Sequence, residues 1–451
     1  LGGRLGYVFS HVAIIVICIG GLIDGNFPLK FAEWRGQIAV ETRRVPASEI
    51  PAISTLPKDN ASFRANIDIA EGSAADLAFI DYKNGYLLQK LPFTIQVDDF
   101  RIEHYPSGQP KSFESDLVLI DPARPTPLKQ TISVNHPLSY QGYTIYQNSF
   151  GDGGSKLNLK SWPLTLDPLL VTDLQATVKQ FAPIEHWQLE ISDFRPFNVN
   201  PDPTGAKAFV NLGPSFQYKL RRKDGTANEY LSYMQPVQQE GRWFYLSGMR
   251  GKVSEPFVYW FMPADTERRL DRFMAFYQTL RNPEALTALA LDTAASGESG
   301  RQAADKERQA VAQFMLTLAR QFVEGGYEKI EATVNETVEA DRRQEASQVY
   351  ATVLQRLLKT VYLAVLRTEG VDLTQPLSAF DSQFLVDAIA AVNLAHDYAA
   401  PFYLELKSFQ QIEATGLQIT RSPGQWLVFP GCLLLVLGVF CMFYLPQRRL
   451  W

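Results

Sequence analysis

The sequence predicts a membrane-anchored α+β protein with a transmembrane helix at each end. Between these helices we expect a large extracytoplasmic β-rich domain of sandwich-like type, followed by a helical region. Three observations predict this class: an uncharged apolar run near each end, short alternating segments through the first half, and helical spacing through much of the second. We expect a transmembrane helix over residues 1–26, the β-rich domain over 27–263 and the helical region over 264–400. A return segment over 401–425, the second transmembrane helix over 426–445 and a cytoplasmic tail over 446–451 follow in order.

The first apolar run extends from Leu5 to Ile23 without a charged residue, which is enough to cross about 30 Å of hydrocarbon. A cleaved signal peptide is the alternative, but the run is too long for the apolar core of one, and no small-residue cleavage site follows Gly25. We therefore expect a permanent span. Because the chain opens on Leu1 and the span begins almost at once, we also expect further residues to precede it.

The second apolar run, Trp426 to Tyr444, predicts the other span. Two spans place both termini on one side of the membrane, and the flanking Arg4, Arg448 and Arg449 mark that side as cytoplasmic. The large middle part is then extracytoplasmic, and a short cytoplasmic tail ends the chain. Arg421 lies on the opposite flank, but it carries little weight because long translocated loops largely escape the charge rule.

The composition of the middle part argues against a nucleic-acid-binding protein and against a disulfide-stabilised domain. Residues 27 to 425 carry a net charge of −7, because the chain total of −5 includes +2 from the three flanking arginines against Asp24. This acidic balance argues against a nucleic-acid partner. All three cysteines, Cys18, Cys432 and Cys441, lie in the apolar runs, so the middle part has no thiol for a disulfide and depends on burial for its stability.

From Pro28 to about Pro263, apolar and polar residues alternate between Pro, Gly and Asn turns, which predicts antiparallel strands in a sandwich or an open barrel. Two of these strands, Phe93 to Arg101 and Trp187 to Arg195, resemble each other and end in the same Asp-Phe-Arg. They are candidates for equivalent strands of a duplicated β-unit. The adjacent Asp98 and Asp99 point to opposite faces of a regular strand, so without a bulge they cannot act as a paired acid and base.

From Asp265 the spacing of apolar residues becomes helical. Three long amphipathic helices are predicted over Glu307 to Phe322, Ala346 to Leu366 and Asp381 to Tyr398. A last extended piece, Tyr403 to Thr420, then returns the chain to the membrane.

His11 is the residue of the first span that is best suited to a chemical role. An imidazole in hydrocarbon is costly without a partner, so His11 is either a functional site or a hydrogen-bonding link between helices, and the residues alone favour neither. If it binds a group, haem iron suits it, because neutral imidazole ligates iron and a flat macrocycle fits between helices lined by Phe9, Ile14 and Ile15. Cys18 shares its face, and we expect it to be a small buried residue rather than a thiolate ligand.

The middle part shows no self-contained active site and no catalytic residue is assigned. Its histidines, His104, His136, His186 and His396, are too scattered for a structural zinc site. No nucleophile stands beside a base in a recognisable pattern.

Several stretches around the spans form a pattern that goes beyond these features. They are Leu5-Gly-Tyr-Val-Phe-Ser-His11, Gly20-Gly21, Asn135-His-Pro-Leu138, Gly142-Tyr143, Tyr146-Gln147, Gly416-Leu-Gln418, Pro423-Gly424 and Arg448-Arg449-Leu-Trp451. In order and placement they resemble the ResB/CcsB family, the haem-handling component of the System II pathway of cytochrome c maturation. In that family two further helices usually precede the one that bears the histidine.

The resemblance implies a subunit of the cytochrome c synthase complex in the bacterial cytoplasmic membrane, with its large domain on the periplasmic side. It implies haem b as cofactor, His11 as axial ligand of the haem iron, a CcsA/ResC-type polytopic partner and apocytochrome c as a second partner. Thioredoxin-like thiol reductants are compatible further partners. The tryptophan-rich attachment motif and the second axial ligand belong to the partner in that family, so this chain would be one component of a haem lyase rather than an enzyme on its own.

A competing hypothesis is a two-span membrane receptor or assembly factor whose outer domain binds a protein and which holds no haem, with His11 bonding only a neighbouring helix.

Overall fold

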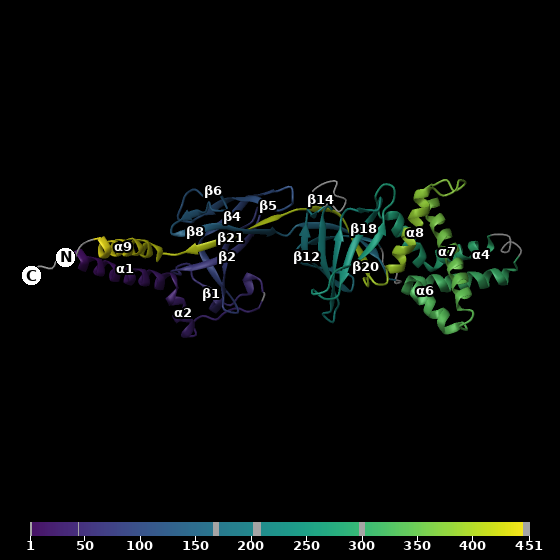
Figure 1. The fold of residues 1–451 in the computed structure, drawn as a ribbon, viewed down its shortest axis with the longest axis horizontal. Helices are drawn as coiled ribbons and strands as arrows, with labels where there is room; N and C mark the ends of the chain where they lie inside the picture. Colours follow the sequence, from purple (N-terminus) through teal and green to yellow (C-terminus); the bar gives the residue numbers. More distant parts are fainter. Residues whose placement is uncertain (1, 44, 166–170, 202–208, 297–302, 445–451) are drawn as a thin grey trace, which may run out of the picture. The chain divides into compact units, whose positions relative to one another are not determined.

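The computed structural model of the chain describes residues 2–43, 45–165, 171–201, 209–296 and 303–444 (Figure 1). The expected cytoplasmic tail, with Arg448 and Arg449, lies outside these residues. The chain forms two compact units. Unit 1 comprises Leu1–Gly154 and Ile412–Trp451, and unit 2 comprises Ser155–Gln411.

This division differs from the expected one, in which a single β-rich domain extended from residue 27 to 263 and a helical region followed it. The β-rich character and the later helical region are confirmed. The strands of the first half, however, are divided at Gly154 between the sheets of unit 1 and those of unit 2. The later helical region belongs to unit 2. The expected return segment, 401–425, also divides, because its two strands join different units.

Unit 1 is built on one strongly curved sheet in the order β6-β5-β4-β3-β2-β21-β8-β7, with β1 pairing beside β4. Its strands are β1 Thr55–Leu56, β2 Phe63–Ala70, β3 Ala74–Tyr82, β4 Gly85–His104, β5 Pro110–Ile120, β6 Leu128–Ser133, β7 Leu138–Tyr140, β8 Tyr143–Asp152 and β21 Glu413–Arg421. Two short 3-10 turns, η1 Ala47–Glu49 and η2 Ala52–Ser54, precede them. The alternating residues of these strands face one core, and β4 contacts β2 and β21 across it without pairing with them.

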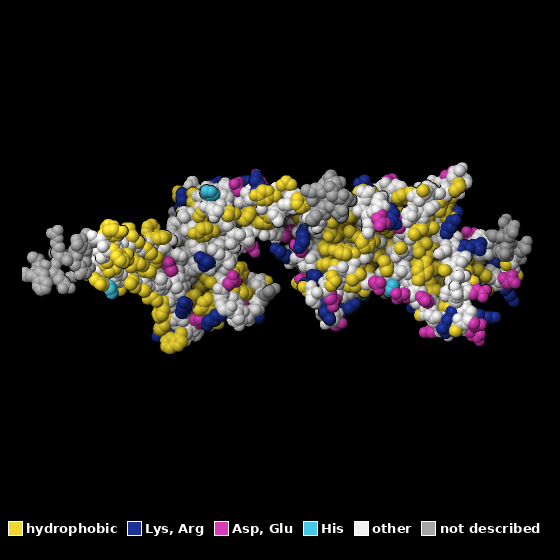
Figure 2. All heavy atoms as spheres, viewed as in Figure 1, with side chains coloured by type: hydrophobic (Ala, Val, Ile, Leu, Met, Phe, Trp, Pro, Cys, Tyr) yellow, Lys and Arg dark blue, Asp and Glu magenta, His cyan; other side chains and the backbone are white. Residues whose placement is uncertain are grey.

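Helices α1 Gly2–Asp24 and α9 Gln425–Tyr444 extend from this sheet, and α2 Phe27–Trp34 follows α1 (Figure 1). Among the described residues, α1, α9 and α7 of unit 2 are long and apolar enough to cross a membrane. Hydrophobic side chains cover most of the visible surface of the α1–α9 pair (Figure 2). Such a surface matches the expected spans.

Unit 2 contains the sheets β11-β12-β15-β16-β18-β17, with β19 beside β18, and β10-β9-β20, together with the small pair β13-β14. Its strands are β9 Lys156–Pro163, β10 Thr172–Thr177, β11 Phe181–Ile184, β12 Trp187–Arg195, β13 Val199–Pro201, β14 Phe209–Asn211, β15 Ser215–Arg221, β16 Ala227–Tyr233, β17 Val237–Gln239, β18 Arg242–Arg250, β19 Val258–Pro263 and β20 Phe402–Gln410. Their inner faces share one large core with the helices of the unit.

The helices of unit 2 lie at one end of its sheets (Figure 1). They are α3 Asp271–Arg281, α4 Pro283–Ala295, α6 Asp305–Thr337, α7 Arg343–Thr368 and α8 Ala379–Leu394. The Trp260 indole of β19 donates to the Ala391 carbonyl of α8 over 2.8 Å, which ties helix to sheet. α7 buries the apolar stripe that includes Leu354, Val361 and Val365 in this core, so we interpret it as an amphipathic core helix rather than a third span.

The two strands with matching sequences, β4 and β12, are equivalent in structure. Each pairs with the preceding strand through a short hairpin and with a later strand of the same sheet, which is β5 for β4 and β15 for β12. Each also carries a bulge at the same place, between Val97 and Asp99 in β4 and between Ile191 and Asp193 in β12. A bulge conserved in position between two sheets supports the duplicated β-unit.

Candidate functional site

His11 lies in the first half of α1 with its side chain exposed on the helix surface. Its Nδ1 is 2.7 Å from the Tyr7 carbonyl oxygen one turn earlier. Because a carbonyl only accepts, Nδ1 must carry the proton of this bond. A neutral His11 therefore keeps the lone pair of Nε2 free, which is the tautomer that a metal-ligating histidine needs.

The opposite face of α1 packs against α9 through small residues. The two helices are antiparallel neighbours: the start of α1 meets the end of α9, and the end of α1 meets its start. A Cβ atom added at Gly20 would lie 2.7 Å from Val428, and one at Gly438 would lie 2.5 Å from the Ser10 hydroxyl oxygen. Close approach of this kind is the usual basis of helix association in membranes. Ala13, which is fully buried, completes this contact face of α1.

His11 does not lie on that contact face, so the structure gives no link from His11 to α9. The residues that share its exposed side at helical spacing are Tyr7, Ile14, Ile15, Cys18 and Leu22. We define these five residues together with His11 as the His11 face. It is an apolar strip with one imidazole, and its chemistry fits the edge of an apolar macrocycle or the side of another helix.

Two expectations about this region need correction. Phe9 is two positions from His11, which places it on nearly the opposite side of the helix, so it does not belong to the His11 face. Cys18 was expected to be buried, yet it is exposed. Its face is left open because α9 occupies the small-residue side of α1 instead.

The remaining stretches that carry the resemblance lie mainly at the centre of unit 1. Gln147 is buried, and its side chain lies 2.6 Å from the Ser115 hydroxyl and donates over 2.7 Å to the Thr415 hydroxyl. Gly416 follows Thr415, and a Cβ there would collide with the Ser149 hydroxyl. These residues therefore fix the position of β21 in the sheet, and we assign them a structural role.

Other motif residues join the sheet to the helix pair. The Gly424 amide donates to the Asp24 carboxylate over 2.7 Å, and Gly424 lies close to the Gly20 backbone. Tyr143 packs edge-on against Phe93 with ring centroids 5.2 Å apart. Two stretches that are distant in the sequence, Gly20-Gly21 and Pro423-Gly424, thus meet where α1 ends and α9 begins. The regular spacing of Gly424, Gly431 and Gly438 was the sequence signal for this packing, and our sequence reasoning did not use it.

Asp98 and Asp99 of β4, the adjacent carboxylates considered as a paired acid and base, each form an ion pair instead. The bulge at Asp98 does change the alternation of side chains, as a paired role would require. However, Asp98 accepts from Gln96 over 2.8 Å and pairs with Lys129 at 3.3 Å, and Asp99 pairs with Arg101. Among the described residues no group of three His, Cys, Asp or Glu side chains could hold a metal ion.

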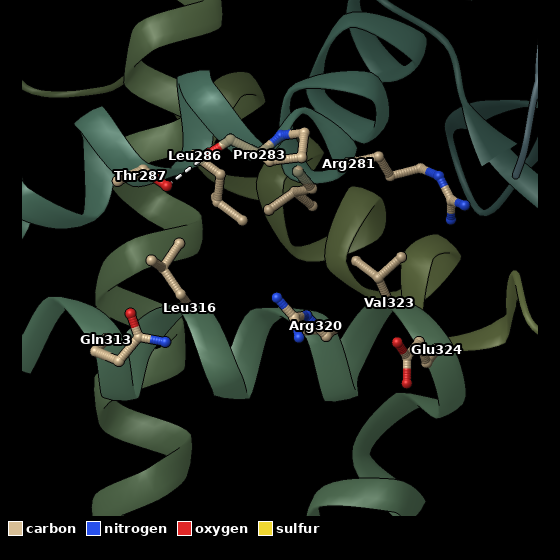
Figure 3. A pocket seen from close by; sticks show the side chains of 10 residues that line it. Arg281, Pro283, Leu286, Thr287, Gln313, Leu316, Arg320, Val323 and Glu324 are labelled. Atoms are coloured by element: carbon tan, nitrogen blue, oxygen red, sulfur yellow. Dashed lines mark hydrogen bonds between the residues drawn. The ribbon is translucent and has the colours of Figure 1, made fainter. Parts of the chain in front are cut away.

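A cavity of about 270 Å³ lies in unit 2 between the α3–α4 turn and α6 (Figure 3). Its walls combine apolar side chains such as Leu286, Leu316 and Val323 with the side chains of Arg281 and Arg320. It is slightly smaller than most small-molecule sites. The hydroxyl of its Thr287 already donates to Pro283, as the dashed line in Figure 3 shows, whereas the Nε of Arg281 is buried without a hydrogen-bond partner among the described residues.

Comparison with known proteins gives one consistent result. A family model described as the ResB-like family matches residues 2–451. The chain is similar to the cytochrome c biogenesis protein CcsB of Gloeobacter violaceus, with 35% identity over 167 residues that cover 37% of this chain and 28% of that protein. It is 40% identical to CcsB of Picosynechococcus over 162 residues, which cover 36% of this chain and 28% of the relative.

A plant relative extends the range of similar proteins. The chloroplastic cytochrome c biogenesis protein CCS1 of Arabidopsis thaliana is 24% identical over 185 residues, which cover 37% of this chain and 26% of the relative. Each of these aligned stretches spans less than a third of the relative that it matches.

Proposed function

The chain belongs to the ResB-like family, and from this membership we propose that it acts in cytochrome c biogenesis as a membrane-anchored subunit that holds haem at His11. α1 and α9 cross the membrane side by side, and the β-sheet of unit 1 and the whole of unit 2 stand on its extracytoplasmic side. The complex would transfer haem b across the membrane and support its covalent attachment to apocytochrome c.

The observation that carries the haem assignment is the hydrogen bond from His11 Nδ1 to the Tyr7 carbonyl oxygen. It fixes the ring on the helix surface and orients the unprotonated Nε2 away from the backbone. Haem iron accepts such a nitrogen as an axial ligand. The apolar neighbours Ile14 and Ile15, both more than half exposed, would cover the macrocycle edge.

The packing of α1 explains why a second protein is needed. Its small-residue side is occupied by α9, and its His11 face remains open within this chain. An open imidazole would sit in hydrocarbon, where a lone polar group is costly. A polytopic partner of the CcsA/ResC type would close this face and supply the second axial ligand. We assign the attachment chemistry to that partner.

Replacement of His11 tests the haem assignment directly. The protein is purified in mild detergent from cells that also make the partner, and bound haem is measured per protein by its absorption. In His11→Gly we expect most of this haem to be lost, and we expect added imidazole to restore it because free imidazole can occupy the vacated ligand position. The control is His186→Ala, an exposed histidine of unit 2 that lies outside the stretches that carry the resemblance and should leave bound haem unchanged.

Undiminished haem with an unchanged spectrum in His11→Gly would overturn the assignment. A colourless preparation of the unaltered complex would instead favour the competing hypothesis of a receptor or assembly factor without haem.

A further inference from the structure

The short helix α2 carries an apolar face that no part of the described chain covers. Phe27, Phe31 and Trp34 follow one another at four- and three-residue spacing and therefore share one side of the helix. Their side chains are 59%, 43% and 79% exposed. Three large exposed hydrophobic residues on so short a helix are more than isolated surface residues.

The other side of α2 is firmly attached to unit 1. Leu29 is buried in the unit 1 core. Glu33 accepts a hydrogen bond from the Tyr82 hydroxyl over 2.9 Å and pairs with Lys83. The helix is therefore a fixed part of the unit, and its apolar face points outward because the inner face is already used.

The start of α2 is fixed in the same way. Asn26 adopts the left-handed conformation between α1 and α2, and its side chain caps the Leu29 amide and donates over 2.5 Å to the Ser62 carbonyl. α2 turns away from the axis of α1 at this point (Figure 1). If α1 crosses the membrane, α2 runs across its surface rather than continuing through it.

The level of α2 coincides with the end of the apolar helix pair. Gly424 at the start of α9 bonds Asp24 at the end of α1, and Trp426, the next aromatic residue, is 75% exposed. Tryptophan is enriched where a bilayer meets water. α2 begins only three residues after Asp24, and hydrophobic side chains continue from the helix pair toward α2 (Figure 2).

The charges beside the apolar face fit a lipid surface. Lys30 and Arg35 are exposed, and the Arg35 guanidinium lies 4.9 Å from the Phe31 ring. The acidic residue of the helix, Glu33, faces the protein. An amphipathic helix with aromatic residues on one side and exposed basic residues is typical of binding at the boundary of head groups and acyl chains.

We propose that α2 lies in the extracytoplasmic interface of the membrane that α1 and α9 cross. Phe27, Phe31 and Trp34 are inserted among the lipids, and Lys30 and Arg35 lie near lipid phosphates. This inference rests on the membrane orientation in the proposed function. The helix then sets the height and tilt of unit 1 above the bilayer, because Asn26, Leu29 and Glu33 tie it rigidly to the β-sheet.

Lipid quenching of tryptophan fluorescence tests this inference. The full chain is reconstituted in vesicles of phosphatidylcholine and phosphatidylglycerol with bromine atoms on the upper part of the acyl chains. The fluorescence of one tryptophan is obtained as the difference in fluorescence between the unaltered protein and the variant in which that tryptophan is replaced by phenylalanine. We expect the fluorescence of Trp34 to be quenched about as strongly as that of Trp426 and several times more than that of Trp187, a partly buried tryptophan of unit 2 that serves as the control.

The outcomes separate this inference from the function on which it rests. If Trp426 is quenched and Trp34 behaves like Trp187, the helix pair is in the bilayer and the assignment of α2 is overturned. If neither is quenched, the membrane orientation fails as well. Quenching of Trp34 that disappears when the polytopic partner is added would identify a protein as the occupant of this face and would also overturn the lipid assignment.

Discussion

In unit 1, β4 bulges at Asp98 between β3 and β5, and in unit 2, β12 bulges at Ser192 between β11 and β15. The two β-units share this arrangement but complete it differently. Unit 1 also contains α1, α2 and α9, whereas the sheets of unit 2 share a core with α3, α4, α6, α7 and α8. The described stretches by which the sequence resembles the ResB/CcsB family lie in unit 1, whereas the family model matches residues 2–451 and so covers both units. The difference teaches that a similar β-arrangement is joined to two long apolar helices in unit 1 and to a helix-covered core in unit 2.

The largest expected effect is in unit 2, where the buried Arg272 joins three elements. Its guanidinium pairs with Glu369 at 2.6 Å and with Asp381 at 2.9 Å. Arg272→Ala leaves both carboxylates without their cation, which should lower the free energy of unfolding of unit 2 by about 3 kcal/mol. Calorimetry should show this shift in the unit 2 transition alone, and Arg269→Ala, whose side chain is exposed, is the control. A shift of both units together would show that they do not unfold separately.

The helix pair offers the next largest effect, and it belongs to unit 1. Gly20→Val places a side chain against Val428 and should cost about 2 kcal/mol through overpacking. Gly21→Val is a matched control, because its added side chain meets open space. The thermal midpoint in detergent measures both. Equal midpoints for the two variants would mean that α1 and α9 do not pack through this face.

A smaller effect separates the two equivalent strands. Arg101 of β4 pairs with Asp99 on its own strand and with Asp116 of β5 at 2.7 Å, whereas Arg195 of β12 pairs with Asp193 of its own strand. Arg101→Gln should cost about 1 kcal/mol in urea unfolding, at the upper end for exposed pairs, and Arg195→Gln close to nothing. Similar losses would contradict the cross-strand role of Arg101.

This difference should depend on pH in a defined direction. The Arg101 guanidinium lowers the pKa of Asp116 below its ordinary value of 3.8. The stabilisation is therefore complete above that value and is lost as the pH falls through the pKa of the folded state. The gap between the unaltered protein and Arg101→Gln should close in strong acid.

The smallest expected effect comes from a carboxylate cluster in unit 1. Burial raises the pKa of Glu413, and the charges of Glu71 and Asp99 raise it further. The ionised Glu413 therefore destabilises the fold once the pH exceeds its ordinary value of 4.5. Glu413→Gln should stabilise unit 1 at pH 7 by about 0.5 kcal/mol, and the gain should vanish below pH 4, as urea unfolding at both pH values can show.

An opposite case provides the control for that prediction. Lys111 lowers the pKa of Glu103 through a hydrogen bond, so Glu103→Gln should weaken unit 1 slightly at pH 7. A gain of stability in both variants would mean that net charge, and not the local cluster, controls the effect.

Local patterns predicted much of this molecule. The uncharged runs gave α1 and α9, helical spacing gave α6, α7 and α8, and the repeated Asp-Phe-Arg indicated the equivalent strands β4 and β12. Helical spacing also placed Ile14 and Ile15 beside His11. These are short-range properties, which a sequence displays directly.

The division into units could not be predicted in this way. Phe402–Gln410 and Glu413–Arg421 are neighbouring strands in the sequence, yet the first pairs with β9 in unit 2 and the second with β2 and β8 in unit 1. Pairing partners hundreds of residues away leave no local signal. The contact of Gly20 with Gly424 is hidden for the same reason, because a glycine before a span is as typical of a turn as of helix packing.

The position of β21 has a consequence for how the protein is made. This strand is synthesised after the whole of unit 2, yet it stands between β2 and β8 in the middle of the unit 1 sheet. Unit 2 is a continuous stretch and can fold as soon as it has been synthesised. The sheet of unit 1 must wait with two unpaired strand edges, on β2 and β8, until β21 has been synthesised after unit 2.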